Sequence, residues 1–256
     1  MVWEKTSKDP AIHEGVVTAL IDRKTVLTRS TFSGEEKPLA ANVTQLIIVL
    51  APQPEPSEYL LDQYLIAAER MGVNAIIAFN KSDLLTNEEH LALEQRFAHY
   101  NNIGYQVVFI STRNEVGLMP LMDKLRGQSS ILVGQSGVGK SSLTNALIPE
   151  LKLETNQLSE KSQLGQHTTS ASTLYFLENG GLLIDSPGVR SFRLGDIDRS
   201  TLENGFVDLK PYLGHCRFSD CSHSSEPGCA LQQALAEGKI SAHRLENFLH
   251  MADKLK

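Results

Sequence analysis

Apolar and polar positions fall into alternating blocks, and from residue 43 onward these blocks predict strands and helices in turn. Six segments rich in β-branched residues predict strands at 43–51, 73–80, 105–112, 129–134, 172–177 and 181–186. Helices are expected between them at about 57–71, 88–100, 117–126 and 139–147, with Ser57 and Asn87 as N-caps. Several strands are apolar throughout, which is typical of a sheet covered by helices on both faces. The pattern therefore predicts an α/β fold with a doubly wound sheet.

The two ends of the chain follow other patterns. EGVVTALI (14–21) and TVLTRS (25–30) predict two short strands, which cannot bury a face alone and must pack on something else or belong to a larger β domain. Near the other end, helices are expected at about 229–237 and 242–255. We therefore expect three regions, at residues 1–41, 42–196 and 197–256.

Composition and charge narrow the class of protein. The longest uninterrupted apolar run, 46–51, is far shorter than the ~20 residues that span a bilayer. The opening residues MVWEKTSKDP contain no hydrophobic segment to be cleaved, so a cytoplasmic protein without membrane contact is expected. The net charge of −6 argues against a protein that coats nucleic acid through its overall charge.

The strongest motif lies between a predicted strand and a predicted helix. Residues 134–141, GQSGVGKS, fit G-x-x-x-x-G-K-[ST], a loop whose backbone N–H groups wrap around a diphosphate. Lys140 places a charge against the outer phosphates, and the Ser141 hydroxyl completes the shell of a Mg²⁺ ion. A glycine-rich turn with an exposed lysine is the alternative. The expected nucleotide-binding residues are Gly134, Gln135, Ser136, Gly137, Val138, Gly139, Lys140, Ser141 and Ser142.

A second motif ends the second predicted strand, where it can face the same crevice as the phosphate loop. Its residues are Asn80, Lys81, Ser82 and Asp83. The Asp83 carboxylate can accept hydrogen bonds from the ring N–H and the exocyclic amine of guanine, whereas adenine would leave it unpaired. Alone the motif is ordinary turn chemistry, but beside a phosphate loop it indicates guanine. Ser111 and Thr112, which end the third strand, are expected to close over the base.

A third motif, Asp185-Ser186-Pro187-Gly188, follows the last predicted strand. Asp185 can hold magnesium through water, and the Gly188 N–H can reach a γ-phosphate. The polar segment 152–171 holds a threonine pair, and a threonine hydroxyl there can bind the metal only while the γ-phosphate is present. We favour Thr169 over Thr168 as this ligand. The expected magnesium ligands are Ser141, Thr169 and Asp185.

The order of these loops is rotated. In ordinary GTPases the phosphate loop comes first and N-K-x-D last, whereas here 80–83 precedes 134–141. A sheet whose termini lie close together tolerates such a permutation. Because the chain after Asp185 runs directly into the C-terminal region, we expect movement of this switch to be transmitted there.

All three cysteines lie in the C-terminal region, in the pattern C-x₄-C-x-H-x₅-C formed by Cys216, Cys221, His223 and Cys229. Three thiolates and one imidazole suit a closed, tetrahedral structural zinc site. The alternative, three unlinked cysteines and a surface histidine, would gather soft ligands without a use. The region is too small to fold on its own core, so zinc should supply its folding energy.

Permuted loops followed by this cysteine pattern resemble the RsgA family of small ribosomal subunit biogenesis GTPases, also called YjeQ or YloQ. The resemblance runs from about Glu14 to the last helix. It implies a partial, truncated OB-fold at 1–41, a circularly permuted P-loop GTPase domain at 42–196 and a zinc-binding helical domain at 197–256. It also implies GTP hydrolysis in late maturation of the small (30S) subunit, with turnover stimulated by the subunit. Contacts with 16S rRNA, other assembly factors as further partners, and a monomer are expected.

Three positions bear on mechanism. Gln166 stands where the family usually has arginine, and Ser186 where threonine is usual. Val189 follows Gly188, where many GTPases carry a glutamine that orients the attacking water. The resemblance points instead to His167 as the catalytic group that positions water. The alternative is that His167 only packs, or contacts RNA on the ribosome.

Four functions remain to be separated. The first is a slow GTPase accelerated by the small subunit, and the second is a GTP-dependent ribosome- or RNA-binding module with little turnover, which Val189 keeps open. The third is a zinc-dependent RNA-binding protein whose nucleotide domain is structural. A P-loop ATPase is the fourth, disfavoured by Asp83. We expect the first, with GTP and GDP as ligands and Mg²⁺ and one Zn²⁺ as cofactors.

Overall fold

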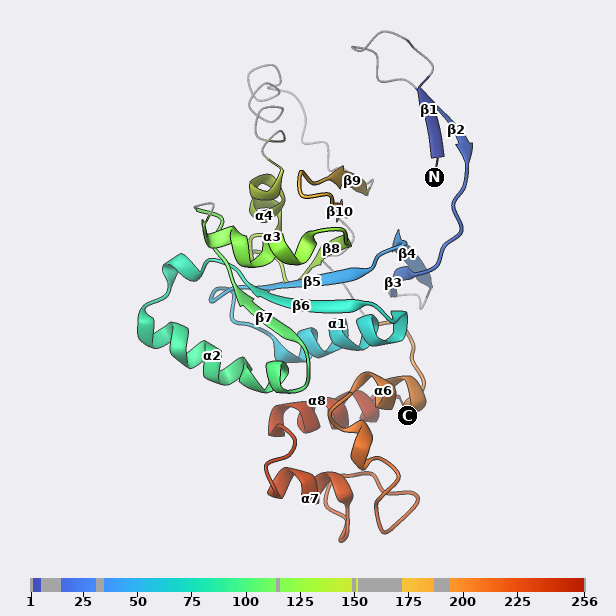
Figure 1. Ribbon diagram of the computed structural model, residues 1–256. Coiled ribbons are helices and arrows are strands. Elements are labelled where there is room, and N and C mark those ends of the chain that lie inside the picture. The colour runs from blue at the N-terminus through green and yellow to red at the C-terminus, as the bar shows by residue number, and fades with distance from the viewer. Residues whose placement is uncertain are drawn as a thin grey trace.

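A six-stranded sheet forms the centre of the molecule (Figure 1), seen in a computed structural model that describes residues 2–5, 15–30, 35–113, 116–148, 151, 172–186 and 194–255. The strands are β5 (Gln45–Leu50), β6 (Asn74–Phe79), β7 (Gln106–Phe109), β8 (Ser129–Val133), β9 (Thr173–Phe176) and β10 (Leu182–Asp185). Their order is β7-β6-β5-β8-β10-β9, all parallel except β9, which is antiparallel to β10. All six lie within the predicted segments.

Helices cover both faces of this sheet (Figure 1). They are α1 (Glu58–Met71), α2 (Asn87–Asn102), α3 (Met119–Leu125) and α4 (Lys140–Leu147). Side chains alternate along β5: Leu46 and Ile48 join the core beneath α1 and α2, whereas Ile47 and Val49 join the core beneath α3 and α4. Because both cores are fully buried, β5 reads as a continuous apolar run. The predicted doubly wound α/β arrangement is confirmed.

Helix starts were predicted with mixed success. Ser57 caps α1 as expected, its hydroxyl accepting the backbone N–H of Leu60. For α2 the prediction was wrong by one residue, since Thr86 and not Asn87 is the N-cap. Thr86 wins because it forms a capping box: its hydroxyl accepts the N–H of Glu89, whose carboxylate accepts the N–H of Thr86.

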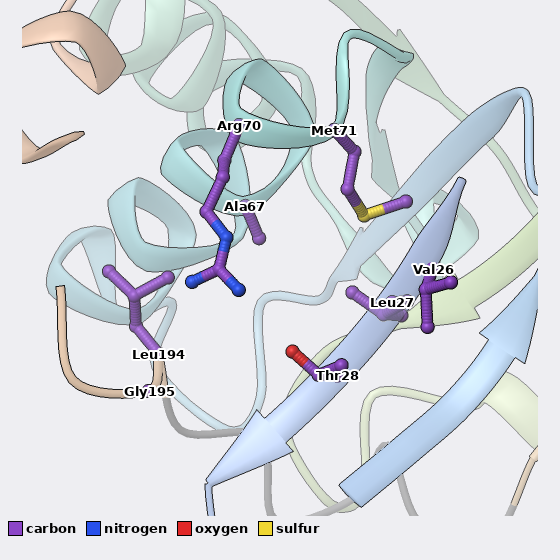
Figure 2. Close-up of a pocket in the computed structure, with 8 residues that line it drawn as sticks. All are labelled: Val26, Leu27, Thr28, Ala67, Arg70, Met71, Leu194 and Gly195. Carbon is purple, nitrogen blue, oxygen red and sulfur yellow. The ribbon is translucent and has the colours of Figure 1, made fainter. Parts of the chain in front are cut away.

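The N-terminal region contains two separate ribbons. The strands are β1 (Val2–Lys5), β2 (Gly15–Ala19), β3 (Val26–Ser30) and β4 (Glu36–Ala41). The two predicted strands are β2 and β3, but they do not pair with each other; β2 pairs with β1 and β3 with β4. Leu27 of β3 is buried in the core under α1. Figure 2 shows this contact, a narrow pocket between β3, α1 and the segment at Leu194 and Gly195.

The C-terminal region is helical and lies against the opposite side of α1 from the sheet (Figure 1). It contains α6 (Arg199–Gly205), α7 (Ala230–Ala236) and α8 (Ala242–Asp253). The last two were predicted, whereas α6 was missed; the Asp198 carboxylate caps it by accepting the N–H of Thr201 at 2.7 Å. Ile66 of α1 joins the apolar core of this region, and a Cβ on Gly205 would collide with it. Helices α1 and α6 therefore pack unusually closely.

Candidate functional site

The loops that follow the parallel strands meet at one edge of the sheet. The Asn80 side-chain amide donates to the carbonyl of Val138 at 3.0 Å, and the Lys81 ammonium donates to the carbonyl of Gly137 at 2.8 Å. The N-K-x-D loop and the phosphate loop are thus bonded to each other. This is the placement that the carboxyl ends of parallel strands dictate.

Glycine is required at two points of the phosphate loop. Gly134 and Gly139 have φ of 136° and 96°. A Cβ at Gly134 would collide with the carbonyl of Val49, and one at Gly139 with the side-chain amide of Asn80. The backbone can therefore turn tightly against β5 and the N-K-x-D loop, and leave its N–H groups for a phosphate.

Lys140 begins α4 and folds back over this loop. Its ammonium donates to the carbonyls of Gly134 and Gln135 at 2.7 and 2.6 Å. The positive charge is therefore already held at the mouth of the loop. Ser141 and Ser142 follow in the first turn of α4, and Asp185 ends β10, which neighbours β8 in the sheet. The fold thus brings Ser141 and Asp185, two of the three expected magnesium ligands, to the same edge.

Asp83 lies in the short helix η1 (Ser82–Leu84), and both of its oxygens have partners. One accepts the Ser111 hydroxyl at 2.6 Å, and the other pairs with the guanidinium of Arg113 at 3.0 Å. The carboxylate is thereby oriented, and Thr112 lies in the chain between its two partners. Arg113 was not predicted, because an exposed arginine after a strand carries no local signal.

A buried acceptor lies where the N-K-x-D loop meets the phosphate loop. The Asn80 side chain is 1% exposed, yet its carbonyl oxygen has no hydrogen-bond partner among the described residues. An unpaired buried acceptor costs free energy unless a ligand or water satisfies it. The site thus offers an acceptor and a cradle of N–H groups, which fits a nucleotide.

Two contacts with the phosphate loop were missed by the sequence analysis. In the proline-rich connection at 52–56, the Gln53 carbonyl accepts the Lys81 ammonium at 3.0 Å and Pro54 lies against Gly137. The Tyr64 hydroxyl on α1 accepts the N–H of Gly134 at 3.1 Å. Tyr64 reads in the sequence as an ordinary core position of an amphipathic helix.

Several predicted site residues lie outside the described part of the chain: Gln166, His167, Thr168, Thr169, Gly188 and Val189. Ser186 is described and buried, and its hydroxyl accepts that of Ser172 at 2.9 Å. The roles given to the others stay predictions.

The four predicted zinc ligands converge. The ligand atoms of Cys216, Cys221, His223 and Cys229 all lie within 4.8 Å of one another. Cys216 Sγ is 3.4 Å from the His223 Nδ1 and 3.9 Å from the Cys229 Sγ. These separations match the edges of a tetrahedron around zinc, roughly 3.8 Å for metal–sulfur bonds of about 2.3 Å. Burial lowers the pKa of His223, which favours the neutral imidazole that a metal binds. The donor set and its geometry fit Zn²⁺.

A sheet of this order, a lysine-bearing glycine loop and an N-K-x-D loop that precedes it define a circularly permuted P-loop GTPase. A model of the RsgA GTPase family matches residues 20–195. The chain belongs to that family, and it is therefore a GTP-hydrolysing enzyme.

Individual relatives agree with this assignment. The chain is 43% identical over 255 residues to the small ribosomal subunit biogenesis GTPase RsgA 1 of Vibrio vulnificus strain YJ016, covering 100% of this chain and 72% of the relative. It is 47% identical over 241 residues to RsgA of Chromohalobacter salexigens, covering 94% and 71%.

Two solved structures are similar over nearly the whole chain. YjeQ from Thermotoga maritima superimposes with a TM-score of 0.74 at 31% identity, covering 94% of this chain and 78% of that one. YloQ, described as a circularly permuted GTPase, gives 0.72 at 28% identity, covering 99% and 78%. Among the described residues, no helix combines the length and apolar character needed to cross a membrane.

Proposed function

We propose that this GTPase acts in the maturation of the small (30S) ribosomal subunit and that binding to the subunit, through its 16S rRNA, stimulates turnover. The observation that carries the proposal is the bonding of the N-K-x-D loop to the phosphate loop, in a chain whose family relatives bear the name small ribosomal subunit biogenesis GTPase. We further propose that the protein acts in the cytoplasm as a monomer, with other assembly factors as further partners.

The proposed ligand contacts follow from the positions of the phosphate loop and the N-K-x-D loop. Residues 134–142 form the phosphate loop, whose backbone N–H groups after Gly134 hold the phosphates, and Lys140 exchanges its loop carbonyls for phosphate oxygens. Asp83, oriented by Ser111, accepts the guanine N–H groups. Asn80, Lys81, Ser82 and Thr112 complete the wall around the base. Magnesium, when bound with GTP, neutralises charge that develops on the phosphates.

The proposed switch chemistry rests on residues of the sequence. Ser141, Asp185 and Thr169 would hold the magnesium, and the Gly188 N–H would contact the γ-phosphate. His167 would orient the attacking water, because Val189 has no polar group to do so. The zinc held by Cys216, Cys221, His223 and Cys229 is structural and stabilises the C-terminal region.

A second candidate function is a GTP-dependent binding module in which turnover is incidental, and Val189 is the residue that favours it. Both candidates require guanine selectivity and a nucleotide-dependent affinity for the subunit. They differ in whether the subunit accelerates hydrolysis.

The proposal is tested in two steps. Bound fluorescent GDP should be displaced by GTP and not by a hundredfold excess of ATP, since Asp83 pairs with guanine alone. Sedimentation with purified small subunits should then recover more protein with a non-hydrolysable GTP analogue than with GDP. Displacement by ATP would contradict the nucleotide assignment, and equal recovery in both nucleotide states would contradict the ribosomal one.

A further inference from the structure

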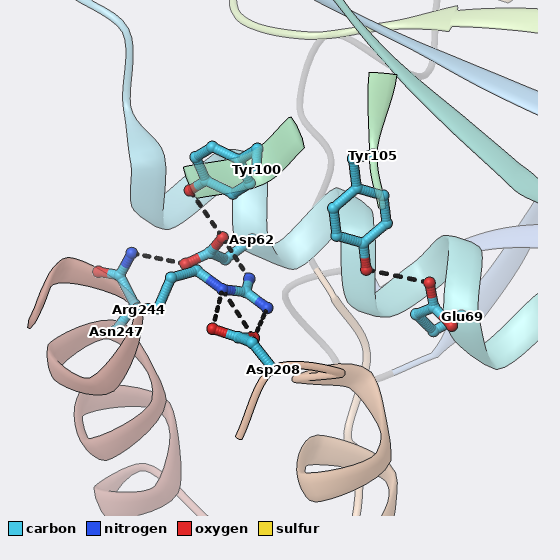
Figure 3. Close-up of polar contacts among 7 residues, drawn as sticks. All are labelled: Asp62, Glu69, Tyr100, Tyr105, Asp208, Arg244 and Asn247. Carbon is cyan, nitrogen blue, oxygen red and sulfur yellow. Dashed lines mark hydrogen bonds and ion pairs between the residues drawn. The ribbon is translucent and has the colours of Figure 1, made fainter. Parts of the chain in front are cut away.

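Helix α1 contacts both the phosphate loop and the C-terminal region. On one side the Tyr64 hydroxyl accepts the N–H of Gly134. Two residues earlier, Asp62 points to α8, as Figure 3 shows. A single short stretch of helix therefore separates the first residue of the nucleotide loop from the region that carries the zinc ligands.

The hydrogen bond between Tyr64 and the phosphate loop is buried. The Tyr64 side chain is 1% exposed, and burial raises the pKa of Tyr64, so its hydroxyl keeps its proton. Gly134 is bonded at both ends: its N–H goes to Tyr64, and its carbonyl accepts the Lys140 ammonium at 2.7 Å. A shift of Gly134 therefore moves the carbonyl that holds the Lys140 ammonium, and with it the charge that faces the phosphates.

The contact at the C-terminal region is equally buried. The Asp62 carboxylate accepts the Arg244 guanidinium at 2.7 Å, the Asn247 side-chain amide at 2.7 Å and the Tyr100 hydroxyl at 2.9 Å (Figure 3). Asp208 pairs with the far side of Arg244. Both Asp62 and Arg244 have 0% side-chain exposure. Buried charges that are fully paired fix one arrangement of the elements that carry them.

We propose that Tyr64 is a positioning residue for the phosphate loop. We also propose that the packing of the C-terminal region on α1, through the bonds of Arg244 and Asn247 to Asp62, affects the nucleotide site by way of this helix. The inference rests on the proposed GTP binding and adds the path by which the zinc-bearing region controls it.

The physical reason is the fate of the Gly134 N–H. Without the hydroxyl, a buried donor loses its partner, and the nucleotide-free loop can relax to satisfy it elsewhere. Bound phosphates need the loop in its present form, so the relaxation must be reversed on binding. The penalty therefore appears in the affinity for ligands that fill the loop.

The first test compares two tyrosines whose hydroxyls form hydrogen bonds at different points of α1. Tyr64→Phe should raise the dissociation constant for GDP about tenfold. The dissociation constant for GMP, which lacks the β-phosphate, should be the same for the variant and the unmodified protein. Tyr105→Phe is the matched control, because its hydroxyl bonds Glu69 of the same helix away from the loop, at 3.0 Å. Equal GDP affinity of the two variants would overturn the role of Tyr64. Failure of the unmodified protein to bind GDP would instead overturn the proposed function.

The second test is a double-mutant cycle. Asn247→Ala removes one hydrogen bond to Asp62 and should weaken GDP binding severalfold when it is the single substitution. In a protein that already carries Tyr64→Phe, adding Asn247→Ala should not weaken GDP binding further. Asn204→Ala is the control, since among the described residues that amide donates only to Ser200, within α6. Additive effects of Asn247→Ala and Tyr64→Phe would overturn transmission through α1.

Hydrogen exchange covers the case in which Tyr64→Phe does not fold. Amides of residues 134–141 should exchange faster in Asn247→Ala than in Asn204→Ala, both without nucleotide. Identical exchange in the two variants would overturn the proposal.

Discussion

At the scale of single residues, guanine selectivity depends on the charge state of one side chain. Asp83 has only acceptor oxygens, and Ser111 and Arg113 hold it in place. Asp83→Asn would present a donor where guanine also donates. We expect GTP affinity to fall at least about a hundredfold. Xanthosine triphosphate, whose ring carries a carbonyl in place of the exocyclic amine, should bind the variant better than GTP. Competition against a fluorescent nucleotide measures both, and an unchanged preference for GTP would remove Asp83 from base recognition.

His167 has the proposed role of orienting the attacking water. If it orients the attacking water, His167→Ala should lower subunit-stimulated turnover by roughly a hundredfold and leave GTP affinity unchanged. His243→Ala, on the first turn of α8, is a control for loss of an imidazole elsewhere. Undiminished turnover in His167→Ala would show that another group positions the water.

At the scale of elements, one ion-pair cluster joins α1 to α8. Arg244→Met would leave Asp62 and Asp208 buried without their cation, and we expect a loss of about 3–5 kcal/mol in the free energy of unfolding. Lys239→Met, in the exposed pair with Glu237, should leave it nearly unchanged. Urea denaturation compares the two, and equal losses would show that the cluster does not hold the elements together.

The zinc site makes a separate prediction for the C-terminal helices. Cys229 is buried and precedes α7 directly, so Cys229→Ser should abolish stoichiometric zinc and unfold the segment from Cys216 to α7. The sheet, with its own two cores, should stay folded. Metal analysis and hydrogen exchange test this, and full zinc content in Cys229→Ser would mean that the cluster does not use this thiol. Ser225→Ala, whose hydroxyl is not among the predicted ligands, is the control.

The elements also show what sequence reasoning can reach. Strand β5 was predictable because both of its faces are apolar, and the zinc ligands because their chemistry is visible in their spacing. Thr86 was missed as a cap since Asn87 is an equally good capping residue in isolation and only Glu89 decides between them. Pairing of β2 with β1 depends on contacts between strands, which no local pattern specifies.

At the scale of the whole molecule, the contacts that join the phosphate loop, α1 and the C-terminal region could not be predicted from the sequence. The loops of the crevice were predictable because each carries its own motif. Asp62, Tyr64 and Arg244 carry none. Gly134 and Arg244, the partners of Tyr64 and Asp62, lie far from α1 in sequence, so these roles arise only when α1 is placed between the sheet and α8. The prediction that a switch passes its movement to residues 197–256 remains untested, and α1 offers a second route for it.

The most direct test of the account is GTP turnover by the full chain with and without purified small ribosomal subunits, with large subunits as the control. We expect slow turnover by the protein alone and a severalfold or greater rise with small subunits only. Turnover that stays the same with small subunits, or rises equally with large ones, would contradict it.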